Sequence, residues 1–154
     1  MRNIKKILLG LLVVLIFIQF IQPYRNMNTQ ELPTGLERTI TVPGNVQSIL
    51  KTACYDCHSN NTNYPWYSRI QPFAWFQAKH INEGKAELNF SEFGSYSRRR
   101  QISKLSGIAN SVKNETMPLS SYTLLHKNAR LSKEEKTLLI DWVEKIKDSL
   151  RSNK

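Results

Sequence analysis

The residues Cys54-Tyr55-Asp56-Cys57-His58 decide how the rest of the chain is interpreted. They hold both cysteines of the 154-residue chain, three positions apart, with a histidine directly after the second. A disulfide between cysteines this close would close a very small loop and add little stability, so the pair indicates local chemistry rather than a covalent scaffold. Apolar residues at helical spacing predict a helix that begins at an Asn45 N-cap and leads directly into the motif: Val46, Ile49, Leu50 and Ala53.

The pattern C-x-x-C-H is the attachment sequence of c-type haem. Two thiols three residues apart can form thioethers with the two vinyl groups of one porphyrin, and the adjacent imidazole can bind its iron. We therefore expect Cys54 and Cys57 to attach one haem c covalently, with His58 as the proximal ligand. Two alternatives remain open. One is a redox dithiol, for which the usual βαβ context is missing; the other is a zinc site, which would need His80 or His126 as a further ligand.

The second axial ligand is predicted to be Met117. It precedes Pro118 in a loop between two predicted helices, and the other methionines, Met1 and Met27, lie before the domain. A thioether on the second face of the iron raises the reduction potential relative to two histidines. The alternatives are a loop methionine that only fills space, or His80 or His126 as the ligand.

Aromatic residues follow the motif and could cover the flat apolar faces of a porphyrin. Trp66 and Tyr67 are the candidates for this role, and Arg69 is a candidate partner for a haem propionate, because guanidinium pairs well with carboxylate. Ordinary core packing and a solvated arginine are the competing interpretations.

Residues 1–22 predict an export signal that stays as a membrane anchor. Basic residues precede the apolar run 7–21, so the N-terminus should stay in the cytoplasm and the remainder should cross the membrane. The residues after the run are not small, so cleavage is not favoured. Fifteen residues span only about 22 Å as a helix, short of a roughly 30 Å hydrocarbon core. The expected location is the bacterial inner membrane, with the haem domain facing the periplasm.

Residues 23–44 contain three prolines and two glycines and no helical periodicity, and are interpreted as a tether. Residues 45–150 then form the haem-binding domain. Further helices are predicted from Pro72 to Glu83 with Gly84 as the stop, from Ser97 to Lys113, and from a capping box at Ser132–Glu135 onward, with a short turn at 122–126. The last two long helices should bury the faces Ile102, Leu105, Ala109, Val112 and Leu139, Trp142, Val143, Ile146, Leu150. No segment alternates like a strand, so the fold class is all-α, a small helical domain behind the anchor.

The formal net charge is +10. A basic surface can steer an acidic protein partner, or it can simply be solvated. The only basic run is Arg98-Arg99-Arg100, which is too short for a nucleic-acid-binding segment. The sequence therefore argues against a nucleic-acid partner.

Several further stretches resemble the cytochrome c-like haem-binding domain family of exported bacterial proteins over about residues 42 to 150. Besides the motif, the resemblance is carried by Ser59-Asn60, Tyr64-Pro65-Trp66-Tyr67-Ser68, Leu88-Asn89-Phe90-Ser91, Met117-Pro118, Leu125-His126 and Ala129-Arg130-Leu131-Ser132. It implies a c-type haem domain with a cytochrome c-like helical fold, in which Met117 occupies the family's Met–Pro position.

The expected function is single-electron transfer, because an iron ligated on both faces has no open coordination site. An enzyme is the second possibility: an open distal site could activate peroxide, with His80 and Arg69 or Arg98 as polar groups. A haem-based sensor or a subunit of a larger membrane complex is the third. The redox partner would be a protein, and an acidic one suits the basic surface.

Overall fold

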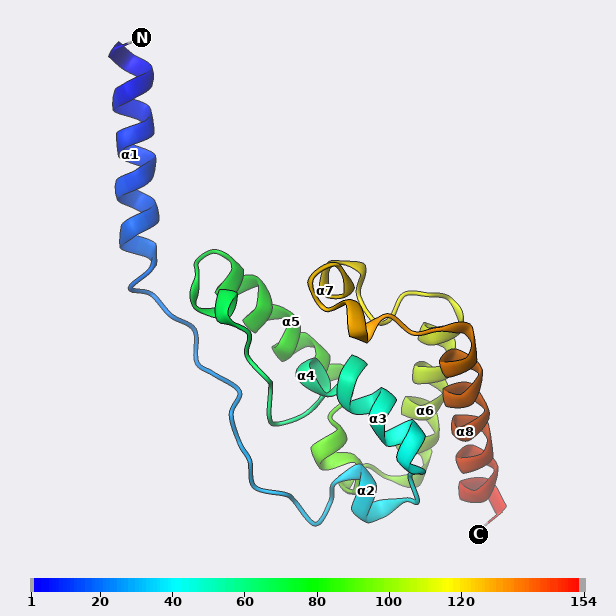
Figure 1. Ribbon diagram of the computed structural model, residues 1–154. Helices are drawn as coiled ribbons and strands as arrows, with labels where there is room; N and C mark the ends of the chain where they lie inside the picture. Colours follow the sequence, from blue (N-terminus) through cyan, green and yellow to red (C-terminus); the bar gives the residue numbers. More distant parts are fainter. Residues whose placement is uncertain (1, 153–154) are drawn as a thin grey trace.

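The computed structural model describes residues 2–152, and Met1 of the predicted 1–22 segment lies outside them. The α-helices in this range are α1 (Arg2–Ile18), α2 (Leu36–Thr39), α3 (Gly44–Ala53), α4 (Tyr55–His58), α5 (Phe73–Glu87), α6 (Arg98–Lys113), α7 (Ser120–Leu125) and α8 (Lys133–Ser152). Three short 3-10 helices join them: η1 (Trp66–Arg69), η2 (Phe90–Ser95) and η3 (Lys127–Ala129). The only β-type pairing within residues 2–152 is an isolated bridge between Met27 and Asn61. The predicted all-α fold class is confirmed (Figure 1).

The hydrophobic core lies between α3, α6 and α8. Helices α6 and α8 run side by side in opposite directions, and α3 packs against α8 (Figure 1). The core takes its buried residues from the predicted apolar faces: Val46, Ile49 and Leu50; Leu105, Ala109 and Val112; Leu139, Trp142 and Val143. Ile102, predicted to be in this set, is only half-buried, because its neighbour Gln101 is buried instead and donates to the Phe93 carbonyl at 3.2 Å.

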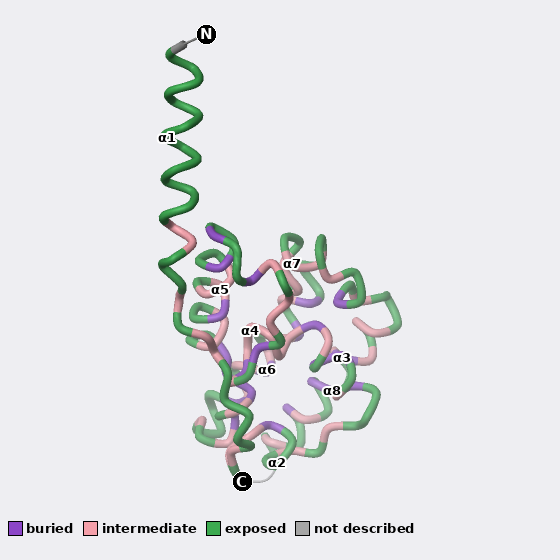
Figure 2. The backbone as a smooth tube through the Cα atoms, turned by 60° about the vertical axis from the view of Figure 1, so that its left-hand side comes forward, coloured by how far each residue is buried: buried purple, intermediate pink, exposed green. Residues whose placement is uncertain are grey.

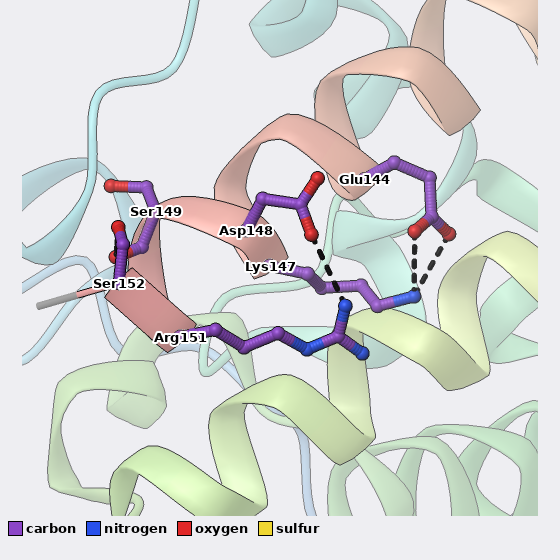
Figure 3. A network of polar contacts seen from close by, with 6 residues as sticks. All are labelled: Glu144, Lys147, Asp148, Ser149, Arg151 and Ser152. Atoms are coloured by element: carbon purple, nitrogen blue, oxygen red, sulfur yellow. Dashed lines mark hydrogen bonds and ion pairs between the residues drawn. The ribbon is translucent and has the colours of Figure 1, made fainter. Parts of the chain in front are cut away.

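Helix α8 begins with the capping box that the sequence predicts. The Ser132 hydroxyl accepts from the Glu135 amide at 3.1 Å, and the Glu135 carboxylate accepts from the Ser132 amide at 2.8 Å. At its other end, Lys147 pairs with both carboxylate oxygens of Glu144, and Arg151 pairs with Asp148 (Figure 3). Such pairs add little stability at a surface. Arg151 and Asp148 are exposed, whereas Lys147 is buried and places its ammonium beside the exposed Glu144.

The segment 23–44, interpreted as a tether, lies against the domain. Leu36 of α2 is buried in the core, and the Asn26 side chain donates to the Ser59 carbonyl at 2.8 Å and to the Thr62 hydroxyl at 2.9 Å. Packing therefore begins before Asn45, where the sequence places the start of the folded domain.

Helix α1 extends away from the domain and is exposed along nearly all of its length (Figure 2). Within residues 2–152, no helix combines the length and the apolar character that a membrane crossing requires. The 17 residues of α1 amount to about 26 Å, against a hydrocarbon core of roughly 30 Å. The anchor at residues 1–22 stays a prediction.

Two predicted helix ends are wrong. Helix α3 begins at Gly44, so Asn45 lies inside its first turn instead of capping it. Helix α5 continues past Glu83 to Glu87, with Gly84 inside it. Glycine often ends helices because it tolerates left-handed backbone, but no glycine of the described chain has a positive φ. Gly84 serves a packing purpose instead, described below.

Candidate functional site

The C-x-x-C-H motif lies where α3 passes into α4. Cys54 ends α3 with a non-helical backbone (φ −127°, ψ −42°), and its carbonyl accepts from the amides of Cys57 and His58 at 3.2 and 3.0 Å. This single turn brings the three chemical groups of the motif together. Both thiols are free and half-buried, and Cys54 packs against the core cluster.

The two thiols are neutral in this fold. Burial, and then the neighbouring Cys57, raise the pKa of Cys54 to about 12. Burial, and then the Asp56 carboxylate, raise the pKa of Cys57 to about 11. A redox dithiol needs the opposite shift, because the thiolate is the nucleophile, so the dithiol alternative is disfavoured. The zinc alternative is also disfavoured, since residues 2–152 contain no group of three or more His, Cys, Asp or Glu side chains placed to hold a metal ion.

The imidazole of His58 is fixed in orientation by the end of α5. Its Nδ1 lies 3.0 Å from the carbonyl oxygen of Leu88, the residue that follows α5. A carbonyl can only accept, so Nδ1 carries the proton and Nε2 keeps a free lone pair. The Phe90 ring packs edge-on against the imidazole, with centroids 6.3 Å apart. This is the arrangement by which proteins hold a metal-binding histidine in one tautomer.

Two cavities meet at the motif. One, of about 390 Å³, lies between α4 and α6, and the other, of about 310 Å³, lies between α5 and the start of α7. We call the pair the motif cleft, because six residues line both cavities: Ala53, Cys54, His58, Glu87, Met117 and Pro118. Their sizes fall within the roughly 300–1,000 Å³ typical of cofactor sites. The structure thus brings Met117 to the same space as Cys54 and His58, although they are about sixty residues apart in sequence.

The residues of the motif cleft fit a covalently attached haem. The cleft offers two thiols for thioether bonds, one imidazole with a free Nε2, and one thioether sulfur. Much of its remaining wall is apolar, including Ile108, Val112, Leu119 and Leu131. This chemistry matches a flat apolar ring with an iron at its centre.

The predicted contacts of Trp66, Tyr67 and Arg69 with haem stay predictions. None of the three lines either cavity of the motif cleft. Trp66 is 79% exposed and touches Tyr67 edge-on, and Arg69 is exposed. Of the two rival histidines, His80 lines the α5–α7 cavity and His126 lines neither.

Asp56, the second middle residue of the motif, attaches α7 to α4. Its carboxylate accepts from the Tyr122 hydroxyl at 2.7 Å and from the Asn63 amide at 3.1 Å. Burial, and then this hydrogen bond, raise the pKa of Tyr122 above its usual range. The Tyr122 ring stacks on His126 at 4.1 Å, and His126 Nε2 is hydrogen-bonded to the Tyr67 hydroxyl. Tyr122 therefore lines the α5–α7 cavity and Asp56 holds it there, a role that no sequence pattern indicates.

Two further residues of the site are not apparent from the sequence. A Cβ on Gly84 would lie 2.7 Å from the Cys57 carbonyl oxygen, so only glycine lets α5 approach the motif this closely. Lys104 is the one Lys or Arg among the residues that line the described cleft, and it pairs loosely with Glu87 at 3.9 Å. A helical lysine and a helical glycine carry no sequence signal for either role.

A comparison with protein families finds a match over residues 13–145 to a model described as a haem-binding domain. No curated protein and no solved structure matches the chain.

Proposed function

Since the chain belongs to the haem-binding domain family, we propose that it attaches one haem c covalently through Cys54 and Cys57 and transfers single electrons, with His58 and Met117 as axial ligands. The domain would then be a cytochrome c-like carrier. One observation supports this above all others: both cavities of the motif cleft are lined by Cys54, His58 and Met117 together.

Each residue of the cleft has a defined task in this proposal. The Leu88 carbonyl accepts from His58 Nδ1 and holds the ring, so that Nε2 would be available to bind the iron. Met117 offers a neutral sulfur, and the apolar walls exclude water from the space between the two ligands. Lys104, at the edge of the cleft, can pair with a haem propionate, the task that the sequence assigns to Arg69. When bound, haem supplies an iron that gains and loses one electron.

The axial assignment is tested by Met117→Ala, with His80→Ala as the matched control from the same cavity. We expect Met117→Ala to remove the sulfur-to-iron charge-transfer band at the red end of the spectrum and to lower the reduction potential, because a thioether favours the reduced iron. His80→Ala should leave both unchanged. If the spectrum and the potential change in His80→Ala and stay the same in Met117→Ala, His80 is the ligand, and the thioether assignment is wrong.

We further propose that the domain works outside the cytoplasm at the bacterial inner membrane, with α1 as the export signal that stays at the membrane. The support is the order of basic residues before an apolar run, together with the need of c-type haem attachment for an exported protein. A protein redox partner with an acidic surface suits the net charge of +10.

A peroxidase or a haem sensor is the second candidate, favoured by one observation. His80 and Tyr122 line the α5–α7 cavity beside Met117, so displacement of the sulfur would leave polar groups near an open site. Neither Arg69 nor Arg98 lines the cleft, which removes the arginines that this reading would use. High-spin iron that binds carbon monoxide readily in the unaltered protein would favour this candidate over the carrier.

A further inference from the structure

Apolar and polar side chains are sorted between two ends of the molecule. Within residues 2–152, α3, α6 and α8 expose no large apolar side chain. The exposed ones lie on α1 and the chain after it, around η1 and the first turns of α5, at Met117, and on α7. This sorting singles out one end of the domain as a surface with a partner, because contiguous exposed apolar patches on soluble proteins mark interaction sites.

The patch on the domain consists of six residues, which we call the aromatic face: Trp66, Ile70, Phe73, Phe76, Leu124 and Leu125. Its two halves are joined through side chains. Trp66 packs on Tyr67 with ring centroids 5.9 Å apart, and the Tyr67 hydroxyl is hydrogen-bonded to His126, which directly follows Leu125. The η1–α5 half and the α7 half therefore form one surface, beside the α5–α7 cavity of the motif cleft.

The aromatic face continues into α1. Gln19 and the backbone of Gln71 exchange hydrogen bonds in both directions, at 2.9 and 3.3 Å. The Ile21 carbonyl accepts from the side chains of Gln71 at 2.7 Å and Trp75 at 3.2 Å. These bonds attach the end of α1 to the η1–α5 junction. Figures 1 and 2 both show α7 and the first turns of α5 at the end of the domain from which α1 projects.

Acidic residues are missing from the segments that build this end. All 12 Asp and Glu residues lie in the ranges 31–56, 83–115 and 134–148. The ranges 7–30, 57–82 and 116–133 contain none, but they contain six lysines and arginines: Arg25, Arg69, Lys79, Lys127, Arg130 and Lys133. The partner of the aromatic face should therefore be apolar with negative charge at its surface.

We propose that the aromatic face lies on an anionic lipid bilayer, so that the α5–α7 side of the motif cleft is held at the membrane surface. Aromatic side chains favour the interface between lipid and water, and basic residues are attracted to anionic headgroups. The face is attached to α1, whose apolar side chains are exposed along the helix, and this favours lipid over a protein partner. The inference rests on the proposed location of the domain at the membrane and adds a second contact that orients it.

The test is amide hydrogen exchange of the full-length, haem-loaded protein on protein-free vesicles. Vesicles of phosphatidylcholine with phosphatidylglycerol are compared with vesicles of phosphatidylcholine alone, and α1 is present in both. We expect slower exchange in η1 and α7 on the anionic vesicles, and unchanged exchange in α8. Lys127→Gln should reduce this protection by about fivefold, the effect of roughly 1 kcal/mol per basic residue at an anionic surface. Lys145→Gln on α8 is the matched control and should have no effect.

The double variant Trp66→Ser and Leu125→Ser should abolish the protection, and Met27→Ser, another exposed apolar position, should not. Equal exchange of η1 and α7 on both vesicle types would overturn the proposal. Protection seen only in native membranes that contain proteins would also overturn it and would assign the face to a protein partner. The haem spectrum is unaffected by either result. Alkaline phosphatase fused to the C-terminus tests export separately. If the fused enzyme is inactive in cells, the domain is not exported, and the proposed location fails instead of the lipid contact.

Discussion

The α6–α8 pair and the α5–α7 pair are built in opposite ways. Helices α6 and α8 pack apolar faces against each other and expose polar side chains, such as Asp148 and Arg151 at the end of α8 (Figure 3). Helix α5 buries only Ala74 and Ile81 and exposes Phe73 and Phe76, and α7 buries no residue. The first pair completes its packing within the protein. The second leaves much of its apolar surface exposed or facing the cleft.

This difference predicts where the haem contributes stability. The α6–α8 side has a core of its own, whereas α7 is attached to the motif chiefly by the hydrogen bond between Tyr122 and Asp56. Elements with few buried apolar contacts open at low free energy. A ligand that binds only the folded state then stabilises the elements that it touches.

The largest effect is expected from Cys54→Ala combined with Cys57→Ala. Without the thiols no thioether can form, so all haem should be extractable after denaturation. Amide exchange should rise in α5 and α7 far more than in α6 and α8, because α8 does not line the cleft and α6, which does, also packs its buried face against α8. The measurements are a pyridine haemochrome assay on the denatured protein and hydrogen exchange by mass spectrometry.

His80→Ala is the control for this experiment, because it alters the same cavity without removing a thiol. It should keep the haem attached after denaturation. Haem that stays covalently bound in the double cysteine variant would contradict the attachment chemistry. An equal rise of exchange in all four helices would contradict the division of the domain into two sides.

The second prediction compares one residue from each side. Leu105 of α6 is fully buried, so Leu105→Ala should lower the free energy of unfolding by roughly 2–5 kcal/mol through lost burial and a new cavity. Phe76 of α5 is 60% exposed, and Phe76→Ala should change it by no more than about 0.5 kcal/mol. Urea unfolding followed by circular dichroism measures both. A large loss for Phe76→Ala would show that α5 belongs to the core.

The same division explains which helices the sequence predicts well. Helices α3 and α8 and most of α6 follow helical periodicity because each buries one face in the protein's own core, and most of their predicted core residues are confirmed. Ile146 and Leu150 of α8 are only half-buried and pack against the edge of the core. The pattern of α5 predicts its buried face wrongly, since its aromatic residues lie at the surface and its buried residues are Ala74 and Ile81. The burial of Leu36 could not be predicted from the sequence either, because α2 is a single turn within a stretch rich in proline and glycine.

The motif predicts the reactive groups of the site from the sequence. It does not predict the other residues that surround them. Cys54, Cys57 and His58 are adjacent in the chain, and the Met–Pro step marks Met117, which the structure brings to the same cleft. The Leu88 carbonyl, Lys104 and Tyr122 come from three other segments. Their roles depend on long-range packing, which periodicity and spacing do not encode.

The smallest of the three effects concerns Gly84, where the two sides of the domain meet. A Cβ at Gly84 would stand 2.7 Å from the Cys57 carbonyl oxygen, which is backbone and cannot rotate away. Gly84→Ala should therefore push α5 from the motif and lower the free energy of unfolding by about 1–3 kcal/mol. Gly44→Ala at the start of α3 is the matched control, because a Cβ there meets nothing within 4 Å and Gly44 lines neither cavity of the cleft. It should raise stability by up to about 1 kcal/mol through better helix propensity. Opposite signs for these two substitutions in thermal unfolding would locate the close contact at the motif. A gain of stability from both would show that α5 can move without cost.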